Sequence, residues 1–164
     1  MQGYVMSINN ARSYIYIQTP YLLPTEPVLT ALQTAALAGV DVRVMIPKRG
    51  DSWLIHKGTM SYIDDMLEAG VKVYLYKAGF LHSKLMVSDD EISTVGSTNM
   101  DFRSFEHNFE ANAFFYDKET ALALKNIFYN DIKSSMLLTQ KIWNSRSGKN
   151  KISESVMRLL SPLL

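Results

Sequence analysis

The sequence has no cysteine among its 164 residues, which excludes a disulfide scaffold, a cysteine-based zinc knuckle and a thiol nucleophile. It also lacks any uninterrupted apolar run near the roughly 18 residues that a membrane-spanning helix needs. An excess of charge of one sign is missing too, because 17 Lys and Arg residues balance 16 Asp and Glu residues. We therefore expect no nucleic-acid partner, and any polyanion must be bound locally.

The composition that remains is typical of one folded domain. With 47% hydrophobic residues, the chain has enough apolar material for one ordinary core and too little length for two. Its start, from Met1 to Tyr4, lacks the basic and apolar regions of a signal peptide and leads directly into sequence typical of a folded domain. This abrupt entry suggests a piece of a longer protein.

Helical and strand periodicities alternate along the first half of the chain. Strands are indicated where apolar residues alternate at period two, and helices where they recur three or four residues apart. Gly39 and Gly70 are natural C-terminal stops for two of the helices. The pattern predicts helices over Tyr4–Arg12, Pro27–Gly39 and Ile55–Ala69, and strands over Ser13–Gln18, Val40–Ile46 and Val71–Tyr76.

The second half predicts shorter strands and then a helix. The strand candidates are Lys84–Ser88, Ile92–Val95 and Glu110–Tyr116, and the helix is Lys118–Ser135. The connection Asp89-Asp90-Glu91 is too short to join parallel strands, so the sheet must be mixed. We therefore expect an α/β sandwich with a mixed β-sheet flanked by helices on both faces. Residues 1–136 would form this catalytic unit, and 137–164 a basic amphipathic helical tail.

The charge of this tail differs from that of the rest of the chain. From Thr139 onward there are five basic residues against one acidic, a net charge of +4, which leaves 12 basic against 15 acidic elsewhere, a net charge of −3. Apolar residues lie between the basic ones, so the tail could rest on an anionic membrane surface. The alternative is a terminal helix that packs on its own domain with its lysines in solvent.

Functional groups are densest between Leu81 and Asn112. If a strand begins at Leu81, His82 and Lys84 project from the same face, an imidazole beside a cation. Such a pair suits phosphate chemistry, because imidazole can attack or donate a proton and an ammonium neutralises a phosphoryl oxygen. On the same reasoning, Ser97 and Asn99 could hold phosphate oxygens, and Glu110 could bond the far imidazole nitrogen of the histidine.

Some polar residues of the same region have an ordinary structural explanation. Asp89 lies in the expected tight turn, where an aspartate usually bonds backbone amides at the strand end. His56 and His107 are expected to be structural or exposed. The functional interpretation rests on the ordered set of residues and on no single member of it.

That ordered set resembles a known signature. His82-Ser-Lys84, four residues and Asp89, followed by Gly96-Ser97-Thr-Asn99, is similar to the His-x-Lys-x4-Asp and Gly-Ser-x-Asn motifs of the phospholipase D superfamily. Flanking segments such as Gly79-Phe-Leu-His-Ser-Lys84 and Asn108-Phe-Glu-Ala-Asn-Ala-Phe114 resemble the C-terminal catalytic half of bacterial cardiolipin synthases, and this resemblance extends from end to end.

The resemblance implies a role for each of these residues. His82 would be one of two active-site histidines, and Lys84 a phosphate ligand. Ser97 and Asn99 would complete the phosphate pocket, and Glu110 would orient the histidine. Asp89 would be structural, and neither a metal nor another cofactor would take part.

The reaction that the resemblance implies is a double displacement between two phosphatidylglycerol molecules. One histidine attacks the phosphodiester to form a phosphatidyl-histidine intermediate, and the other protonates the leaving glycerol. The headgroup hydroxyl of the second lipid then takes the phosphatidyl group, which gives cardiolipin. His82 belongs to the second motif of the family and is expected to be the acid and base. Phospholipid donors other than phosphatidylglycerol stay open.

This chain carries one such motif, whereas cardiolipin synthases carry two and have N-terminal transmembrane helices. It therefore resembles half of an active site, expected at the bacterial inner membrane in the full-length protein. Its partners would be anionic phospholipid, the membrane surface, and either the N-terminal half or a homodimer mate. The alternatives are a stand-alone homodimeric phosphodiesterase or nuclease, and an inactive fragment that binds only lipid headgroups or its partner domain.

Overall fold

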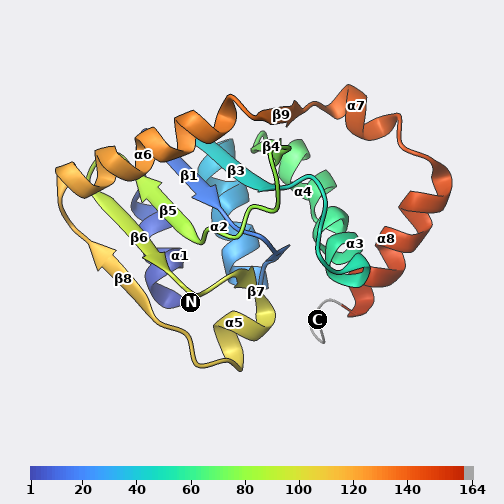
Figure 1. Ribbon diagram of the computed structural model, residues 1–164, viewed down its shortest axis with the longest axis horizontal. Coiled ribbons are helices and arrows are strands. Elements are labelled where there is room, and N and C mark those ends of the chain that lie inside the picture. The colour runs from blue at the N-terminus through green and yellow to red at the C-terminus, as the bar shows by residue number, and fades with distance from the viewer. Residues whose placement is uncertain (161–164) are drawn as a thin grey trace.

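A mixed sheet of seven strands, in the order β8-β6-β5-β1-β3-β4-β9, forms the centre of the fold (Figure 1). The computed structural model describes residues 1–160, apart from the side chains of 149–151. Strands β1, β3 and β4 run parallel to one another, and the other pairs in this sheet are antiparallel. The bounds are β1 (Tyr14–Gln18), β3 (Asp41–Pro47), β4 (Lys72–Tyr76), β5 (Leu85–Ser88), β6 (Ile92–Gly96), β8 (Asn112–Phe115) and β9 (Ser135–Leu138). A separate parallel pair joins β2 (Leu22–Leu23) to β7 (Met100–Asp101).

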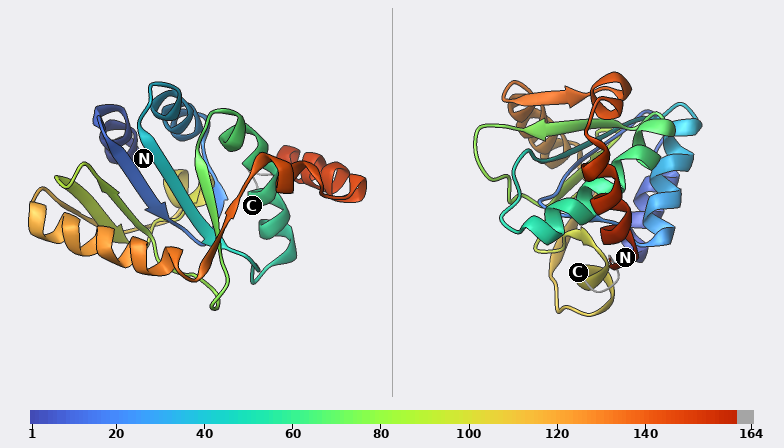
Figure 2. Two further views of the ribbon diagram at one scale, coloured as in Figure 1. Left: turned by 90° about the horizontal axis from the view of Figure 1, so that it is seen from above. Right: turned by 90° about the vertical axis from the view of Figure 1, so that its right-hand side faces the viewer.

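Helices cover both faces of this sheet (Figure 2). Helix α6 lies along one face, and α1, α2 and α4 lie along the other. The helices are α1 (Gln2–Asn10), α2 (Glu26–Leu37), α3 (Trp53–Ser61), α4 (Ile63–Glu68), α5 (Phe102–Glu106), α6 (Lys118–Ile132), α7 (Gln140–Asn144) and α8 (Gly148–Leu160). The predicted mixed sheet with helices on both faces is confirmed.

Alternation along β1 explains how one strand serves two cores. Tyr14 and Tyr16 point to the face covered by α6, where the Tyr16 ring stacks on Phe128 with centroids 4.9 Å apart. Ile15 and Ile17 point to the opposite face and join the larger apolar cluster beneath α1 and α2. Every residue of β1 is buried. A central strand covered on both faces is apolar at consecutive positions, as this one is.

Several predicted elements differ in extent from those observed, and for two of them a backbone hydrogen bond gives the reason. The helix expected over Ile55–Ala69 is two helices that meet at Tyr62, whose backbone N–H bonds the Thr59 carbonyl three residues back at 3.3 Å. This tighter turn interrupts the regular α-helical bonding. The strand expected from Glu110 begins at Asn112, because the backbone N–H of Ala111 donates to the Ser97 hydroxyl at 3.0 Å and not to a strand partner.

Asp89 clamps the opposite edge of the sheet, away from the candidate site. It sits in the three-residue turn between β5 and β6, Asp89-Asp90-Glu91, in which Asp89 and Asp90 have positive φ, of 54° and 58°. Its carboxylate accepts hydrogen bonds from the backbone N–H groups of Arg12, Ser13 and Tyr14, at 2.7, 2.9 and 2.8 Å. Through these contacts Asp89 joins the turn to the start of β1.

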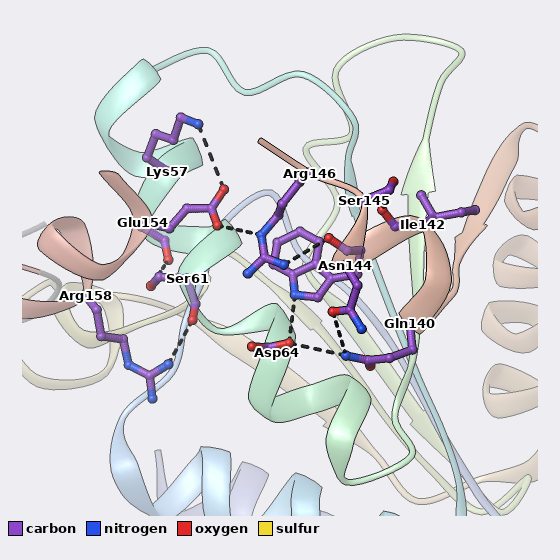
Figure 3. A network of polar contacts seen from close by, with 12 residues as sticks. Lys57, Ser61, Asp64, Gln140, Ile142, Asn144, Ser145, Arg146, Glu154 and Arg158 are labelled. Atoms are coloured by element: carbon purple, nitrogen blue, oxygen red, sulfur yellow. Dashed lines mark hydrogen bonds and ion pairs between the residues drawn. The ribbon is translucent and has the colours of Figure 1, made fainter. Parts of the chain in front are cut away.

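The C-terminal segment packs on α3 and α4 through a polar network (Figure 3). The Trp143 indole donates to Asp64 at 2.9 Å, and Arg158 forms an ion pair with Asp65 at 2.6 Å. The buried Glu154 accepts from Arg146 at 3.0 Å. These contacts tie α7 and α8 to the domain.

The expected boundary between residues 136 and 137 falls inside β9, which pairs with β4 and completes the sheet. The helices α7 and α8 lie after this boundary, and residues 161–164 of the expected tail lie outside the described residues. Within residues 1–160, none of the helices combines the length and apolar character that crossing a membrane requires.

Candidate active site

The candidate site lies where several strand ends meet. The parallel strands β1, β3 and β4 have their carboxyl ends on one side of the sheet, which we call the edge of the site. Since β5 is antiparallel to β1, it starts at this edge, with Leu85 opposite Gln18. By the same reasoning β6 ends here and β8 starts here. Open α/β sheets bind ligands outside the carboxyl ends of their parallel strands. Segments that meet at this edge carry His82, Lys84, Ser97, Asn99 and Glu110.

His82 and Lys84 lie just before β5, so the strand considered from Leu81 begins only at Leu85. In this segment Leu81 is buried, His82 is exposed, and Ser83 and Lys84 are half-buried. The half-buried Lys84 donates from Nζ to the carbonyl oxygen of His82 at 2.9 Å. An ammonium group therefore lies beside the backbone of the residue that carries the exposed imidazole.

A buried glutamine anchors the segment between these two residues. Gln18, at the end of β1 and 1% exposed, accepts a hydrogen bond from the Ser83 hydroxyl at 2.6 Å. Its amide nitrogen donates to Asp131 of α6 at 2.8 Å. Because both polar atoms of the Gln18 amide are bonded inside the domain, the Ser83 side chain is held inward. The residues on either side of it, His82 and Lys84, are then free to face the carboxyl ends of the parallel strands. Gln18 was not among the predicted site residues, although a polar residue at the end of an otherwise apolar strand is a signal visible in the sequence.

Glu110 is the centre of a second polar group. Its carboxylate accepts hydrogen bonds from the hydroxyls of Ser97 and Ser104, the latter at 3.1 Å, and from the Asn108 amide at 3.4 Å. The Ser97 bond, followed by those of Asn108 and Ser104 and by the charge of Lys84, lowers the pKa of Glu110. The group is thus held as a carboxylate that fixes the Ser97 hydroxyl.

Glu110 does not bond His82 in the described structure, which corrects the expected contact with the far imidazole nitrogen. All three side-chain donors to its carboxylate are other residues. The ring of His82 instead packs beside that of Phe80, with centroids 5.6 Å apart. The physical reason is local: two hydroxyls and an amide close to Glu110 satisfy its oxygens, while the imidazole remains on the exposed side of its loop.

Asn99 is partly organised by the same group. Its Nδ2 donates to the Ser104 hydroxyl at 3.3 Å, and that hydroxyl donates in turn to Glu110, so Ser104 links the two side chains. Its Oδ1 is buried and has no hydrogen-bond partner among the described residues. Ser104 was missed in the sequence, although Asp101 caps α5 by accepting from its backbone N–H at 2.6 Å. This cap holds the backbone of Ser104, whose hydroxyl donates to Glu110.

Burial and three nearby carboxylates act on the pKa of Lys84 in opposite directions. Burial lowers the pKa of the Lys84 ammonium, whereas Glu110, Asp101 and Asp51 raise it through their charges. The Lys84 ammonium therefore lies among three negatively charged side chains. A phosphate that approached it would gain a strong local attraction while being kept from the carboxylates, which favours a fixed orientation.

The remaining histidines lie elsewhere. His56 belongs to α3, where burial and the charge of Lys57 lower its pKa. The exposed His107 follows α5 and packs its ring beside Phe102, with centroids 5.4 Å apart. The described residues contain no group of three or more His, Asp or Glu side chains placed to hold a metal ion.

Replacing Glu110 with Gln is expected to lower the rate of phosphate chemistry at this site by about 10- to 100-fold, the usual cost of losing an orienting group. The reason is that the Ser97 hydroxyl loses its charged acceptor. Steady-state kinetics measures the effect, and thermal unfolding shows whether the domain remains folded.

A double variant separates this positioning role from general damage. If Glu110 acts through Ser97, adding Ser97→Ala to Glu110→Gln costs little more than the worse single change. The conservative Glu110→Asp should recover part of the rate. Fully additive losses, or normal turnover in Glu110→Gln, would contradict the role.

The comparisons with known proteins agree on the family. A family model described as "Cardiolipin synthase, PLD-like domain" matches residues 4–132. The chain is 46% identical over 162 residues to the cardiolipin synthase of Listeria monocytogenes and, also at 46%, to cardiolipin synthase 1 of Staphylococcus epidermidis. Each alignment covers 99% of this chain and 34% or 33% of the relative, so the chain spans about a third of their length.

Solved structures share the fold. The phospholipase D family member Nuc from Salmonella typhimurium matches 85% of this chain and 90% of its own, with 20% identity and a TM-score of 0.72. The phosphatidylserine synthase of Haemophilus influenzae matches 98% of this chain and 44% of its own, with 16% identity and a TM-score of 0.73. Since the family model covers most of the sequence and the fold agrees, this chain belongs to the cardiolipin synthase, PLD-like domain family.

Proposed function

We propose that this chain is the C-terminal catalytic half of a cardiolipin synthase, which transfers a phosphatidyl group between two phosphatidylglycerol molecules. The observation that carries the proposal is the 46% identity to cardiolipin synthases over 99% of the chain. The site geometry supports it, because an exposed imidazole, a half-buried ammonium and a fixed hydroxyl border one edge of the sheet. In the full-length protein this half would work at the bacterial inner membrane.

In the first half-reaction, an imidazole nitrogen of the other half attacks the phosphorus of phosphatidylglycerol. A P–N bond forms, the P–O bond to glycerol breaks, and His82 gives a proton to the leaving glycerol oxygen. Lys84, Ser97 and Asn99 hold the phosphoryl oxygens.

In the second half-reaction, a headgroup hydroxyl of another phosphatidylglycerol gives its proton to His82, and its oxygen attacks the phosphorus. The new P–O bond replaces the P–N bond, so two phosphatidylglycerol molecules become cardiolipin and glycerol. His82 begins and ends protonated, as a general acid and base must.

The mechanism needs a second imidazole on the opposite side of the phosphorus, and His56 and His107 lie in other surroundings. That imidazole would come from the N-terminal half of the same enzyme. Light scattering and an assay of cardiolipin formation from phosphatidylglycerol vesicles test this. We expect the isolated chain to be an inactive monomer, and the polypeptide with both halves to form cardiolipin. A dimer with His82-dependent turnover would favour the homodimeric phosphodiesterase instead, and inactivity of both would favour a headgroup-binding fragment.

The exposed side of α8 supports a membrane contact by the same half. Its apolar stripe is 70%, 48%, 81% and 40% exposed at Ile152, Val156, Leu159 and Leu160. The neighbouring α3, which packs beside α8, begins with Trp53 at 63% exposure. Such a stripe on a helix tied to the domain can enter a bilayer interface while the other side of the helix stays packed.

The double substitution Ile152→Ser and Leu159→Ser is expected to weaken binding to phosphatidylglycerol vesicles at least about tenfold, since burying one such side chain is worth about 1.5–3 kcal/mol. Co-sedimentation with vesicles measures the partition. Leu37→Ser, at a position 74% exposed on α2, is the matched control and should leave binding unchanged. Equal binding of the double variant and the parent would rule out α8 as the membrane face.

A further inference from the structure

A pocket of about 640 Å³ opens beside the candidate site, within the range of small-molecule sites, about 300–1,000 Å³. It lies between two loops that leave the carboxyl ends of the adjacent strands β3 and β4. Lys48, Arg49 and Asp51 line it from the first loop, and Lys77 and Phe80 from the second. The mechanism above uses none of these residues.

The charge of this pocket is strongly positive. Lys48, Arg49 and Lys77 are exposed, and in the described part of the chain their side chains form no hydrogen bond or ion pair. Asp51 is the one carboxylate among the lining residues, and it already accepts from the Tyr21 hydroxyl at 2.6 Å. By contrast, Arg43 and Lys72 elsewhere on the sheet are both neutralised by Asp41. Three cations without counterions in one pocket suit an anionic group.

The pocket adjoins the catalytic segment directly. Phe80 lines it, and the Phe80 ring packs against the imidazole of His82. Asp51 also lines it and is close enough to Lys84 to influence that ammonium. The loop that carries Lys77 and Phe80 continues into His82. An anion in this pocket would therefore lie next to the phosphate that His82 serves.

We propose that this pocket binds the phosphodiester of the acceptor phosphatidylglycerol, an inference that rests on the proposed function. The acceptor differs from water or a simple alcohol in carrying its own phosphate, one glycerol unit from the hydroxyl that reacts. Transfer to it brings two phosphates together, and Lys84 serves only the transferred one. Lys48, Arg49 and Lys77 hold the other, which makes the pocket a determinant of acceptor specificity.

The test compares two acceptors of one phosphatidyl-enzyme intermediate in the two-half enzyme. The parent and the variant Lys48→Gln/Arg49→Gln receive phosphatidylglycerol vesicles and labelled glycerol, and the rates of cardiolipin formation and of glycerol exchange are measured together. Because both reactions share every step up to the intermediate, their ratio reports only on the acceptor. We expect the ratio to fall about tenfold or more in the variant, as charged hydrogen bonds worth at least about 1.4 kcal/mol are lost.

Controls identify each possible failure. The variant Lys118→Gln/Lys133→Gln removes the same charge outside the pocket and should keep the parent's ratio. An unchanged ratio in the pocket variant, or an equal fall of both rates, overturns the inference and leaves the proposed function standing. A parent that exchanges glycerol but forms no cardiolipin overturns the proposed function as well.

Inorganic phosphate at constant ionic strength distinguishes a headgroup from a free anion. A headgroup site predicts that phosphate lowers the ratio in the parent and leaves the variant unaffected. If phosphate instead changes both rates equally, and only when the pocket cations are present, the pocket serves a free phosphate and the headgroup assignment is wrong.

Discussion

Replacing His82 with Ala in the two-half enzyme is expected to lower cardiolipin formation by about 10³- to 10⁴-fold, because the proposed acid and base is lost from both half-reactions. The imidazole is exposed and contributes little to packing, so the domain should remain folded. Initial rates with phosphatidylglycerol vesicles measure the loss, and the thermal unfolding midpoint reports on the fold.

His107→Ala is the matched control for this change. His107 is also an exposed histidine beside a phenylalanine ring, but it follows α5 and has no role in the mechanism. Its removal should leave the rate within about twofold of the parent, as surface changes away from a site usually do. Normal turnover in His82→Ala would contradict the assignment of His82 to the active site.

Replacing Lys84 with Met is expected to lower turnover by about 10²- to 10³-fold, the typical cost of removing one group that stabilises transition-state charge. Met keeps most of the length of the side chain and loses the ammonium, which donates to the His82 carbonyl and faces Glu110, Asp101 and Asp51. The change therefore leaves the carboxylates near the phosphate without their cation. Steady-state kinetics with vesicles gives the loss in kcat.

Lys133→Met removes a charge of the same kind from an exposed position that bonds only Asn130, and it should leave kcat unchanged. Lys84→Arg provides a second comparison. Arg restores the charge but not the compact geometry of the ammonium, so recovery should be partial. If Lys84→Met kept the parent's kcat and raised only KM, Lys84 would contribute to binding and not to the transition state.

Much of the sheet could be predicted from local patterns. The alternation in Ser13–Gln18 and Val40–Ile46 matches β1 and β3 to within a residue or two, because alternate side chains of each strand lie on opposite faces of the sheet. The break at Tyr62 could not be predicted, since it depends on a 3.3 Å backbone bond to Thr59 and on the Arg158 guanidinium 3.9 Å above the Tyr62 ring. The pairing of β9 with β4 could not be predicted from local sequence either.

The candidate site was predictable where it depended on spacing and unpredictable where it depended on partners. The order of His82, Lys84 and Ser97 marks them as a set, and the sheet brings their segments to one edge. The acceptor that holds Ser83, Gln18, lies 65 residues earlier, and no periodicity links the two. The bonds of Glu110 likewise depend on Ser104, whose backbone is held by the cap at Asp101.

The Asp89 clamp has a consequence for the order in which the chain acquires its structure. The amide of Tyr14 is bonded by a carboxylate 75 residues further along, and the adjacent strand β5 arrives just before it. At ribosomal rates of about 5–20 residues per second, roughly 4 to 15 seconds pass between the synthesis of β1 and that of these partners. The pairing of β1 is thus completed only after the hairpin that carries Asp89 has emerged, and until then the strand lacks one of its two neighbours.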